Sequence, residues 1–296
     1  MSKYFNQIAG TRAEAFRHQM VELPKFPTLI EKADVFPGQA DAMSVPAKAQ
    51  KDAGKSGLEA CRRIRIVESA LLQNRFRRSD SLDEAEESYR VLRTRLLRLK
   101  ASQGLRSVQL ASATAGEGKT MTALNLAVRC ANLQDMSVLL VDADIRSKGL
   151  TGLLELPPSP GLAEVLCGRT EPEKAILATD ATNLYVLPSG ASDVAPPELF
   201  AGPRWQEFMS WCNKTFKLII VDSPPMLGLS DSELISAPCD GVLMVIRERQ
   251  VKRELLEKLA RQLDAKKLLG LVYNAAEHSK TRSGYYGAPE AALKLG

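Results

Sequence analysis

No apolar run in the sequence approaches the roughly 18 residues that a membrane-spanning helix needs. The opening residues, MSKYFNQIAG, lack the apolar core of a secretory signal peptide, so we expect a cytoplasmic protein. The five cysteines are scattered and form no C-x-x-C pair. A disulfide framework or a zinc site is therefore not expected, and buried free thiols are favoured. Aromatic residues are few, at 5%, which suits an α/β protein rich in Leu, Ala and Val.

Charge is unevenly placed along the chain. Residues 1–105 carry 19 Lys and Arg against 13 Asp and Glu, whereas residues 106–296 are close to neutral. A basic excess of this kind can serve an acidic membrane surface, a nucleic acid or an acidic partner, or it can be an ordinary solvated helix face. Composition alone leaves these interpretations open.

The first 80 residues have the pattern of a basic extension. Residues 1–20 have the apolar spacing of a short amphipathic helix, and residues 22–57 have the Pro, Gly and Ala content of a flexible linker. Residues 58–78 contain no Pro or Gly and place apolar residues at helical spacing between arginines. A basic amphipathic helix there could lie on an anionic membrane, or dock on a partner or on the core of the protein.

A longer helix is predicted over residues 81–100. Acidic residues fill its first turn, which suits the positive end of the helix dipole. Glu87, Arg90 and Arg93 follow one another at intervals of three residues, so they share one edge of this helix.

The most informative stretch is a strand, a loop and a helix in succession. An apolar strand, Val108–Ala111, leads through small residues into Gly116–Thr120, and a helix free of Pro and Gly follows over Met121–Leu133. Glycines let backbone N–H groups approach phosphate oxygens, and the helix N-terminus adds its positive dipole end. Lys119 can then reach the β and γ phosphates, and the Thr120 hydroxyl can bind Mg²⁺. Alanine replaces the first glycine of the usual G-x-x-x-x-G-K-[ST] motif, so this is a variant phosphate-binding loop.

Carboxylates stand at the ends of two other predicted strands. Residues 137–141 form an apolar run that ends in Asp142 and Asp144, and residues 217–221 form another that ends in Asp222. In open α/β sheets the carboxyl ends of the strands border the ligand-binding crevice, so these acids should meet the phosphate loop. Together they predict a metal–nucleotide site suited to phosphoryl transfer or nucleotide hydrolysis.

Strands and helices alternate over residues 106–275. Further strands are predicted at 183–187, 241–246 and 268–274, and further helices at 161–168, 197–211 and 251–263. This alternation implies an α/β fold, in which a doubly wound, mostly parallel sheet of the P-loop NTPase type carries helices on both faces.

Several separated motifs resemble those of the bacterial tyrosine kinases (BY-kinases) of capsule and exopolysaccharide systems, within the larger group that includes MinD- and ParA-like ATPases. The matching segments are Ser112–Thr120 (Walker A), Val138–Arg146 (Walker A′), Ile219–Pro225 followed by Asp231 (Walker B), and Glu87-x-x-Arg90-x-x-Arg93 (an oligomerisation motif). The resemblance covers roughly residues 81–276, the P-loop tyrosine kinase domain. It leaves residues 1–80 as a largely helical or disordered N-terminal extension and residues 277–296 as a flexible tail.

The resemblance implies an ATP-dependent protein-tyrosine autokinase that regulates polysaccharide polymerisation and export. The residues implied to bind ATP are Ala115, Gly116, Glu117, Gly118, Lys119, Thr120, Met121 and Asn274. Those implied in catalysis are Lys119, Asp142, Asp144, Arg146 and Asp222, and those implied to hold Mg²⁺ are Thr120, Asp142 and Asp222. The implied phosphoacceptors are Tyr285 and Tyr286, and the implied oligomerisation residues are Glu87, Arg90 and Arg93. A tyrosine hydroxyl has a pKa of about 10, so Asp142 or Asp144 would help to remove its proton.

The resemblance also implies partners. Family members need a membrane activator segment, and none is fused here, so we expect a separate membrane activator, a homo-oligomeric ring, and a position at the inner face of the plasma membrane. No nucleic-acid partner is expected. Two other functions stay open: a MinD/ParA-like ATPase on a membrane or nucleoid, and a non-enzymatic regulator of assembly that uses ATP as a switch. The Glu87-x-x-Arg90-x-x-Arg93 motif argues against the first of these.

Overall fold

The computed structural model describes residues 61–65, 80–157, 159–181, 183–228, 230–247 and 266–274, with residues 58, 259 and 264. Outside these ranges lie the predicted helix 1–20, the linker 22–57, the tail with Tyr285 and Tyr286, and most of the predicted helix 251–263. Leu259, within that last segment, is helical. No helix among the described residues is both long and apolar enough to cross a membrane.

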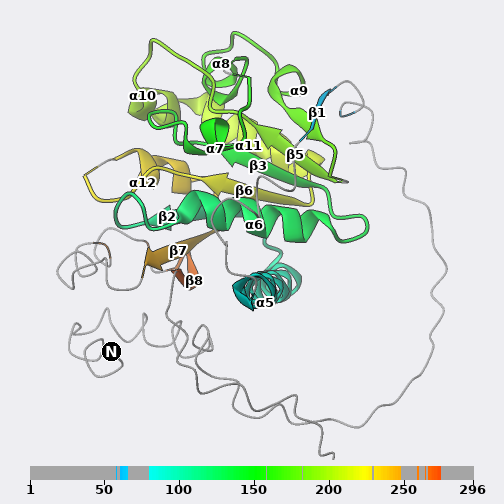
Figure 1. The fold of residues 1–296 in the computed structure, drawn as a ribbon. Coiled ribbons are helices and arrows are strands. Elements are labelled where there is room, and N and C mark those ends of the chain that lie inside the picture. The colour runs from blue at the N-terminus through cyan, green and yellow to red at the C-terminus, as the bar shows by residue number, and fades with distance from the viewer. Residues whose placement is uncertain are drawn as a thin grey trace, which may run out of the picture.

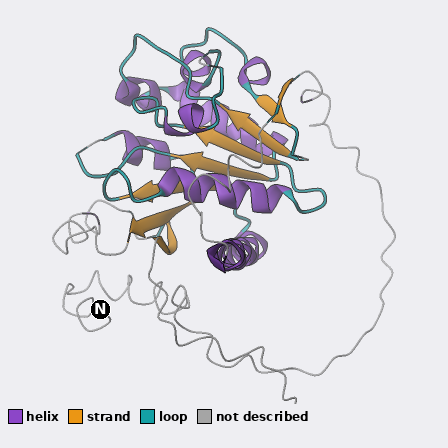
Figure 2. Ribbon diagram, in the orientation of Figure 1, coloured by secondary structure: helices purple, strands orange, loops and turns teal. Residues whose placement is uncertain are grey.

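The described residues place eight strands in one sheet, in the order β1-β4-β5-β3-β6-β2-β7-β8. All neighbours are parallel except β4 and β5. The strands are β1 (Arg62–Ile64), β2 (Ser107–Ser112), β3 (Val138–Asp142), β4 (Leu177–Thr179), β5 (Leu184–Leu187), β6 (Leu218–Asp222), β7 (Gly241–Arg247) and β8 (Leu268–Asn274). The helices are α5 (Asp80–Gln103), α6 (Lys119–Ala131), α7 (Gly149–Leu153), α8 (Leu162–Leu166), α9 (Pro172–Ala175), α10 (Pro196–Ala201), α11 (Pro203–Thr215) and α12 (Asp231–Ser236). Helices cover both faces of the sheet (Figure 2), which confirms the predicted doubly wound α/β fold.

Alternate residues of the central strands face opposite helix layers. In β3, Leu140 packs in one apolar cluster with Leu92 and Leu96 of α5, whereas Leu139 packs in another with Trp205 of α11. Figure 1 shows α6 running along one face of the sheet with α5 beside it. Because the central strands are covered on both faces, they appear in the sequence as continuous apolar runs.

The sheet topology brings the predicted site residues to one edge. Strands β2 and β3 flank β6, and all three run parallel, so their carboxyl ends lie at the same edge of the sheet. Asp142 is the register partner of Asp222, and Asp222 is also the partner of Leu110 in β2. The two strand-end acids are therefore neighbours, beside the strand that leads into the phosphate loop.

The prediction of a helix over residues 58–78 is wrong at Arg62–Ile64. These residues form strand β1, which lies at the edge of the sheet beside β4. Both arginines are exposed, while Ile64 packs against the core. Exposed charges are typical of an edge strand, because they discourage pairing with a further strand. The tertiary contact with β4 thus outweighs the helical spacing of the apolar residues. Strand β4 is itself absent from the sequence-based predictions, and it forms the antiparallel pair with β5.

The single helix predicted over residues 197–211 is two helices, α10 and α11. The break falls at Gly202, whose backbone is extended, and Pro203, the first residue of α11. Proline is tolerated at a first helical position, where its missing N–H has no partner to lose, but not inside a helix. In the sequence, Pro203 therefore indicates that one helix ends before it and another begins at it. The short helices α7, α9 and α12 were also not predicted.

Candidate active site

The loop between β2 and α6 has the backbone of a phosphate-binding loop. Gly116 and Gly118 have φ angles of 82° and 89°, in the left-handed region that glycine adopts without strain. A Cβ atom on Gly118 would lie 1.9 Å from the side-chain nitrogen of Asn274, so a larger residue there would have to displace the Asn274 amide. Ala115 and Gly116 are exposed, and α6 begins at Lys119. The predicted order of strand, loop and helix is confirmed.

The ammonium group of Lys119 lies between two carboxylates. Its Nζ is 3.5 Å from Asp222 Oδ1 and 4.0 Å from Asp144 Oδ2. All three side chains are buried, and buried charges of opposite sign must compensate one another. The fold thus brings Lys119, Asp144 and Asp222 together, as the strand ends predict.

Asp222 is fully buried, and neither of its carboxylate oxygens accepts a hydrogen bond. Burial raises the pKa of Asp222 to about 7, against the opposing influence of the Lys119 ammonium. The negative charges of Asp142 and Asp144 raise this pKa further, and the nearby Thr120 hydroxyl lowers it. Asp222 thus has the Lys119 ammonium as an ion-pair partner but no well-formed hydrogen bond, and a bound cation would complete the contacts of its oxygens.

The described residues contain no cluster of three or more His, Cys, Asp or Glu side chains that could hold a metal ion. Mg²⁺ is commonly bound by one or two carboxylates, while nucleotide phosphates and waters complete its coordination. Asp222, with the Thr120 hydroxyl near it, fits that mode of binding. The donor set therefore suits a magnesium–nucleotide complex rather than a metal held by the protein alone.

Asp142 is also fully buried, but donors of the chain itself engage it. Its Oδ2 accepts hydrogen bonds from the Thr151 backbone N–H at 2.8 Å and from the Thr151 hydroxyl at 2.6 Å. Its Oδ1 accepts one from the Asp144 N–H at 3.2 Å. Burial raises the pKa of Asp142, the hydrogen bonds from Thr151 oppose this, and the charge of Asp144 adds to it. The structure shows Asp142 tying α7 to β3, and its role in metal binding stays a prediction.

Arg146 pairs with Asp231 at the start of α12. Arg146 Nε lies 2.7 Å from Asp231 Oδ2, and the Asp231 side chain is buried. Asp144 makes a separate contact, in which its Oδ1 accepts a hydrogen bond from the Ser147 N–H at 3.1 Å. The Arg146 side chain keeps 44% of its surface exposed. The ion pair thus joins the loop after β3 to α12, and the predicted contact of Arg146 with phosphate stays untested.

Glu117, predicted to contact ATP, has a buried side chain that supports the phosphate loop from within. Its Oε1 accepts hydrogen bonds from the backbone N–H and the hydroxyl of Thr114, and its Oε2 accepts one from the Arg247 N–H at 3.3 Å. Arg247 Nη1 also donates to the Gly116 carbonyl at 3.3 Å. Asn274 Nδ2 donates to the Glu117 carbonyl at 2.8 Å. The carboxyl ends of β7 and β8 therefore brace the loop, which local sequence spacing does not reveal.

Glu87, Arg90 and Arg93, predicted to contact a neighbouring subunit, lie on α5. Arg90 pairs with Glu87 at 3.2 Å and with Glu86 at 3.3 Å. Arg93 Nη1 instead donates to the Arg129 carbonyl in α6 at 3.2 Å. Arg93 therefore reaches the neighbouring helix of its own chain, while Glu87 and Arg90 are exposed. Oligomerisation through this edge stays a prediction.

A buried polar network beside the site was not predicted. It consists of Gln109 in β2, Ser223 after β6 and Ser232 in α12, all fully buried. Gln109 Nε2 lies 2.8 Å from each of the two serine hydroxyl oxygens. Ser223, the partner nearer to Gln109 in the sequence, is 114 residues away along the chain. Local spacing therefore does not reveal the network, and its sign in the sequence is a glutamine within an apolar strand.

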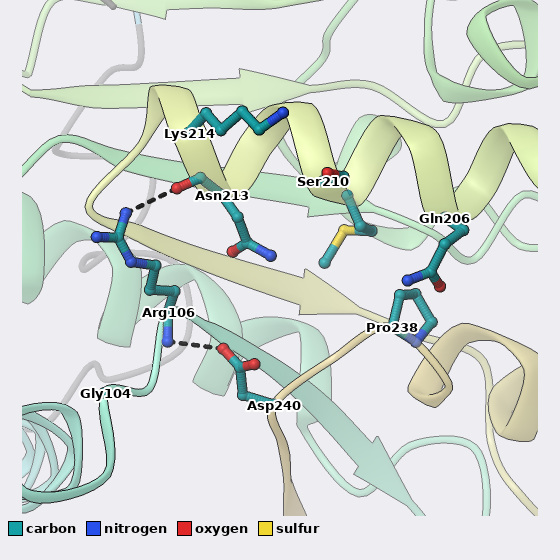
Figure 3. Close-up of a pocket in the computed structure, with 9 residues that line it drawn as sticks. Gly104, Arg106, Gln206, Ser210, Asn213, Lys214, Pro238 and Asp240 are labelled. Carbon is teal, nitrogen blue, oxygen red and sulfur yellow. Dashed lines mark hydrogen bonds between the residues drawn. The ribbon is translucent and has the colours of Figure 1, made fainter.

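A pocket lies at the opposite end of β2 (Figure 3). Arg106 in its wall donates its backbone N–H to Asp240 and its Nη1 to the Asn213 carbonyl, both at 2.7 Å. Arg106 precedes β2, whereas the phosphate loop follows that strand. None of the residues that line this pocket is among those predicted to act on ATP.

Comparisons with known proteins agree with this geometry. The AAA domain family matches residues 106–268, which hold the phosphate loop and the three acids. Tyrosine-protein kinase YwqD of Bacillus subtilis (strain 168) is 33% identical over 207 residues, or 69% of this chain and 87% of that protein. Tyrosine-protein kinase CpsD of Streptococcus agalactiae is 28% identical over 228 residues, or 76% of this chain and 95% of that protein. The kinase domain of Escherichia coli tyrosine kinase ETK has a TM-score of 0.63 at 28% identity, covering 71% of this chain and 83% of that chain. The chain belongs to the family of bacterial tyrosine-protein kinases.

Proposed function

We propose that the protein is an autokinase that transfers the γ-phosphoryl group of ATP to Tyr285 and Tyr286 of a neighbouring copy. The observation that carries this proposal is the Lys119 ammonium between Asp144 and Asp222, next to a glycine-rich loop and a helix N-terminus. That arrangement suits phosphoryl transfer, in which a protein mainly positions groups and offsets charge. Kinship with tyrosine-protein kinases supports tyrosine as the acceptor.

The chain's own residues would bind and orient the nucleotide. Backbone N–H groups of Gly116–Thr120 and the Lys119 ammonium would bind the phosphates and offset the negative charge that develops on them. Asp222, Thr120 and Asp142 would hold Mg²⁺, which supplies further positive charge at the phosphate oxygens when bound. The tyrosine oxygen then forms a bond to the γ phosphorus as the bond to the leaving ADP breaks, and the hydroxyl proton passes to a carboxylate.

Asp144 is the carboxylate that the geometry favours as proton acceptor. Asp142 is fully buried, and both of its oxygens accept hydrogen bonds from the chain. Asp144 keeps 5% of its surface exposed; its Oδ1 accepts one hydrogen bond, from the Ser147 N–H, and its Oδ2 has the Lys119 ammonium at 4.0 Å. An incoming hydroxyl could therefore reach Asp144 more readily than Asp142.

The same proposal includes the cellular setting that the family resemblance implies. A separate membrane activator would contact the domain at the inner face of the plasma membrane, with residues 58–78 against anionic lipid, and phosphorylation would regulate polysaccharide polymerisation and export. The exposed arginines of β1 support a contact with an acidic surface. The exposed Glu87 and Arg90 support a homo-oligomer through α5.

Incubation of the full chain with MgATP, alone and with a fragment of the membrane activator added, followed by anti-phosphotyrosine detection and mass spectrometry of the tail, tests the proposal. We expect phosphate on Tyr285 or Tyr286, and loss of most of the signal in a variant with both changed to Phe. Lys119→Met should abolish the signal, because the γ phosphate loses its ammonium partner. Lys214→Met is the matched control, since Lys214 lines the pocket at the other end of β2, and it should keep the signal.

A wild-type chain that binds ATP and carries no phosphotyrosine when the activator fragment is present would refute the autokinase. Phosphate release with ATP-dependent dimerisation would then support the MinD/ParA-like ATPase instead.

A further inference from the structure

The buried amide of Gln109 contacts the two segments that flank the Walker B loop. Its Nε2 lies 2.8 Å from Ser223 Oγ, 2.8 Å from Ser232 Oγ and 3.0 Å from the Ser232 carbonyl oxygen. Ser223 directly follows Asp222, and Ser232 directly follows Asp231, whose carboxylate pairs with the loop after β3. One side chain in β2 therefore connects the end of β6 to the start of α12.

The hydrogen bonding of Gln109 is poorly suited to a purely stabilising role. Its Nε2 carries two N–H groups and has three acceptors in range, whereas its Oε1 is buried and accepts no hydrogen bond. A buried oxygen without a partner destabilises the folded state, and an apolar side chain of the same size would avoid that penalty. The neighbouring residues of β2, Val108 and Leu110, are apolar and fully buried.

Ser223 is the link between Gln109 and the predicted magnesium ligand. The Ser223 hydroxyl donates to the Leu110 carbonyl at 2.9 Å and receives the Gln109 amide, so two contacts anchor it to β2. The Asp222 carboxylate meets the Lys119 ammonium and lies near the Thr120 hydroxyl, but no hydrogen bond from the sheet itself fixes it. The orientation of that carboxylate toward Lys119, 3.5 Å away, therefore depends in part on how the next residue is held.

We propose that Gln109 is a positioning residue for Asp222. It holds Ser223 and α12 so that the Asp222 carboxylate stays beside Lys119, where the cation of a magnesium–nucleotide complex is received. The proposal rests on the proposed function only in taking Asp222 as a magnesium ligand, and it does not depend on which group accepts the phosphate.

Gln109→Met removes the amide and keeps the length of the side chain. The measurement is the binding of a fluorescent ADP analogue to the full chain as a function of Mg²⁺ concentration, and in EDTA. The Mg²⁺ concentration that gives half-maximal binding should rise about tenfold, the usual effect of losing a group that orients a metal ligand. Binding in EDTA and the thermal midpoint of the nucleotide-free chain should change little, because the loss of the Nε2 hydrogen bonds and the removal of the unpartnered Oε1 have opposite effects on stability.

Val108→Ala is the control for a simple packing effect. Val108 is fully buried in the same strand, in the apolar cluster on the side of α5 and α6. Its truncation should lower the thermal midpoint and leave the Mg²⁺ dependence unchanged. Ser223→Ala should shift the Mg²⁺ dependence as Gln109→Met does, and the double variant should show no additional shift if Gln109 acts through Ser223.

An unchanged Mg²⁺ dependence in Gln109→Met would overturn the proposal. If Gln109→Met does not fold, Ser232→Ala is tested in its place. An unchanged Mg²⁺ dependence in Ser232→Ala would also overturn the proposal. Binding is measured without phosphoryl transfer, so the two proposals can fail separately. A wild-type chain without phosphotyrosine in the presence of the activator fragment refutes only the autokinase, whereas an active kinase with an unshifted Gln109→Met refutes only the positioning role.

Discussion

Glu117→Gln sets two physical effects of opposite sign against each other. The Glu117 carboxylate is buried within the phosphate loop, where it accepts hydrogen bonds from Thr114 and Arg247. The substitution removes a negative charge near the bound polyphosphate, and Coulomb's law alone would then tighten ATP binding. It also weakens the support of the loop, which would weaken binding. We expect the loss of support to prevail.

The contacts of Glu117 set the size of the effect. Hydrogen bonds that involve a charged group contribute about 1.5–3 kcal/mol, against about 0.5–1.5 kcal/mol for neutral pairs. A glutamine oxygen at Oε1 would keep both contacts with Thr114 at the lower strength, while its NH₂ group would face the Arg247 N–H, donor against donor. The loss is about 2–3 kcal/mol, and the removed repulsion returns only about 1 kcal/mol, because Lys119 and the bound Mg²⁺ offset most of the polyphosphate charge. The net result is about 5- to 30-fold weaker binding.

Titration calorimetry of the full chain with Mg²⁺ and ADP measures this affinity directly. Glu207→Gln is the matched control, because Glu207 is an exposed glutamate on α11, and it should bind as the wild type does. Tighter or unchanged binding by Glu117→Gln would refute the reasoning, since it would mean that the carboxylate acts through its charge alone. Urea denaturation of the same samples separates loosening of the loop from global unfolding.

Two further predictions concern Glu164, which links α8 to the loop after β5 through hydrogen bonds from the Gly161 and Ala191 N–H groups. Gly190→Ala would place a Cβ atom 2.1 Å from Glu164 Oε2 at a φ of 74°, so thermal unfolding should show that the folded state loses about 2–4 kcal/mol of stability. The control is Gly228→Ala, which has a φ of 86° and no neighbour within 4 Å, so it should lose only about 1–2 kcal/mol, the cost of a left-handed backbone. Equal losses of stability in the two variants would contradict the clash with Glu164. Burial would raise the pKa of Glu164, but its hydrogen bonds hold it below the usual 4.5. The stabilisation by this carboxylate is therefore present above pH 4.5 and lost as the pH falls through the lower folded pKa. Glu164→Gln should be less stable than wild type at neutral pH, and the gap in urea denaturation should close in acid; a gap that stays constant with pH would reject this.

The parts of the site that could be predicted lie on short contiguous motifs. The glycines before Lys119 and the helix after it are read from one stretch of sequence. Asp142 and Asp222 each close an apolar run, and the geometry of a parallel sheet brings such ends to one edge. Neither inference requires knowledge of a side-chain contact, which is why the structure agrees with both.

Contacts between distant segments could not be predicted in this way. Arg146 meets a carboxylate 85 residues further along the chain, and Glu117 meets the backbone of Arg247 across 130 residues. Local spacing predicts that Glu117 contacts ATP, because this residue lies within the phosphate-binding motif. Its burial and its hydrogen-bond partners show instead that its side chain supports the loop. The strand Arg62–Ile64 is a similar case, since a pairing with β4 decides its conformation against its own periodicity.

Buried polar atoms without hydrogen-bond partners concentrate beside the nucleotide site. Five such side-chain atoms occur among the described residues, and three of them belong to Gln109 and Asp222. Each destabilises the ligand-free fold by about 1–3 kcal/mol, so the apolar layers on either side of the sheet must offset a local penalty at this crevice. A cation beside Asp222 removes part of that penalty, and it does so only in the folded state, so its binding shifts the equilibrium toward folding. The burial that weakens the empty crevice is therefore the same feature that makes it receptive to a magnesium–nucleotide complex.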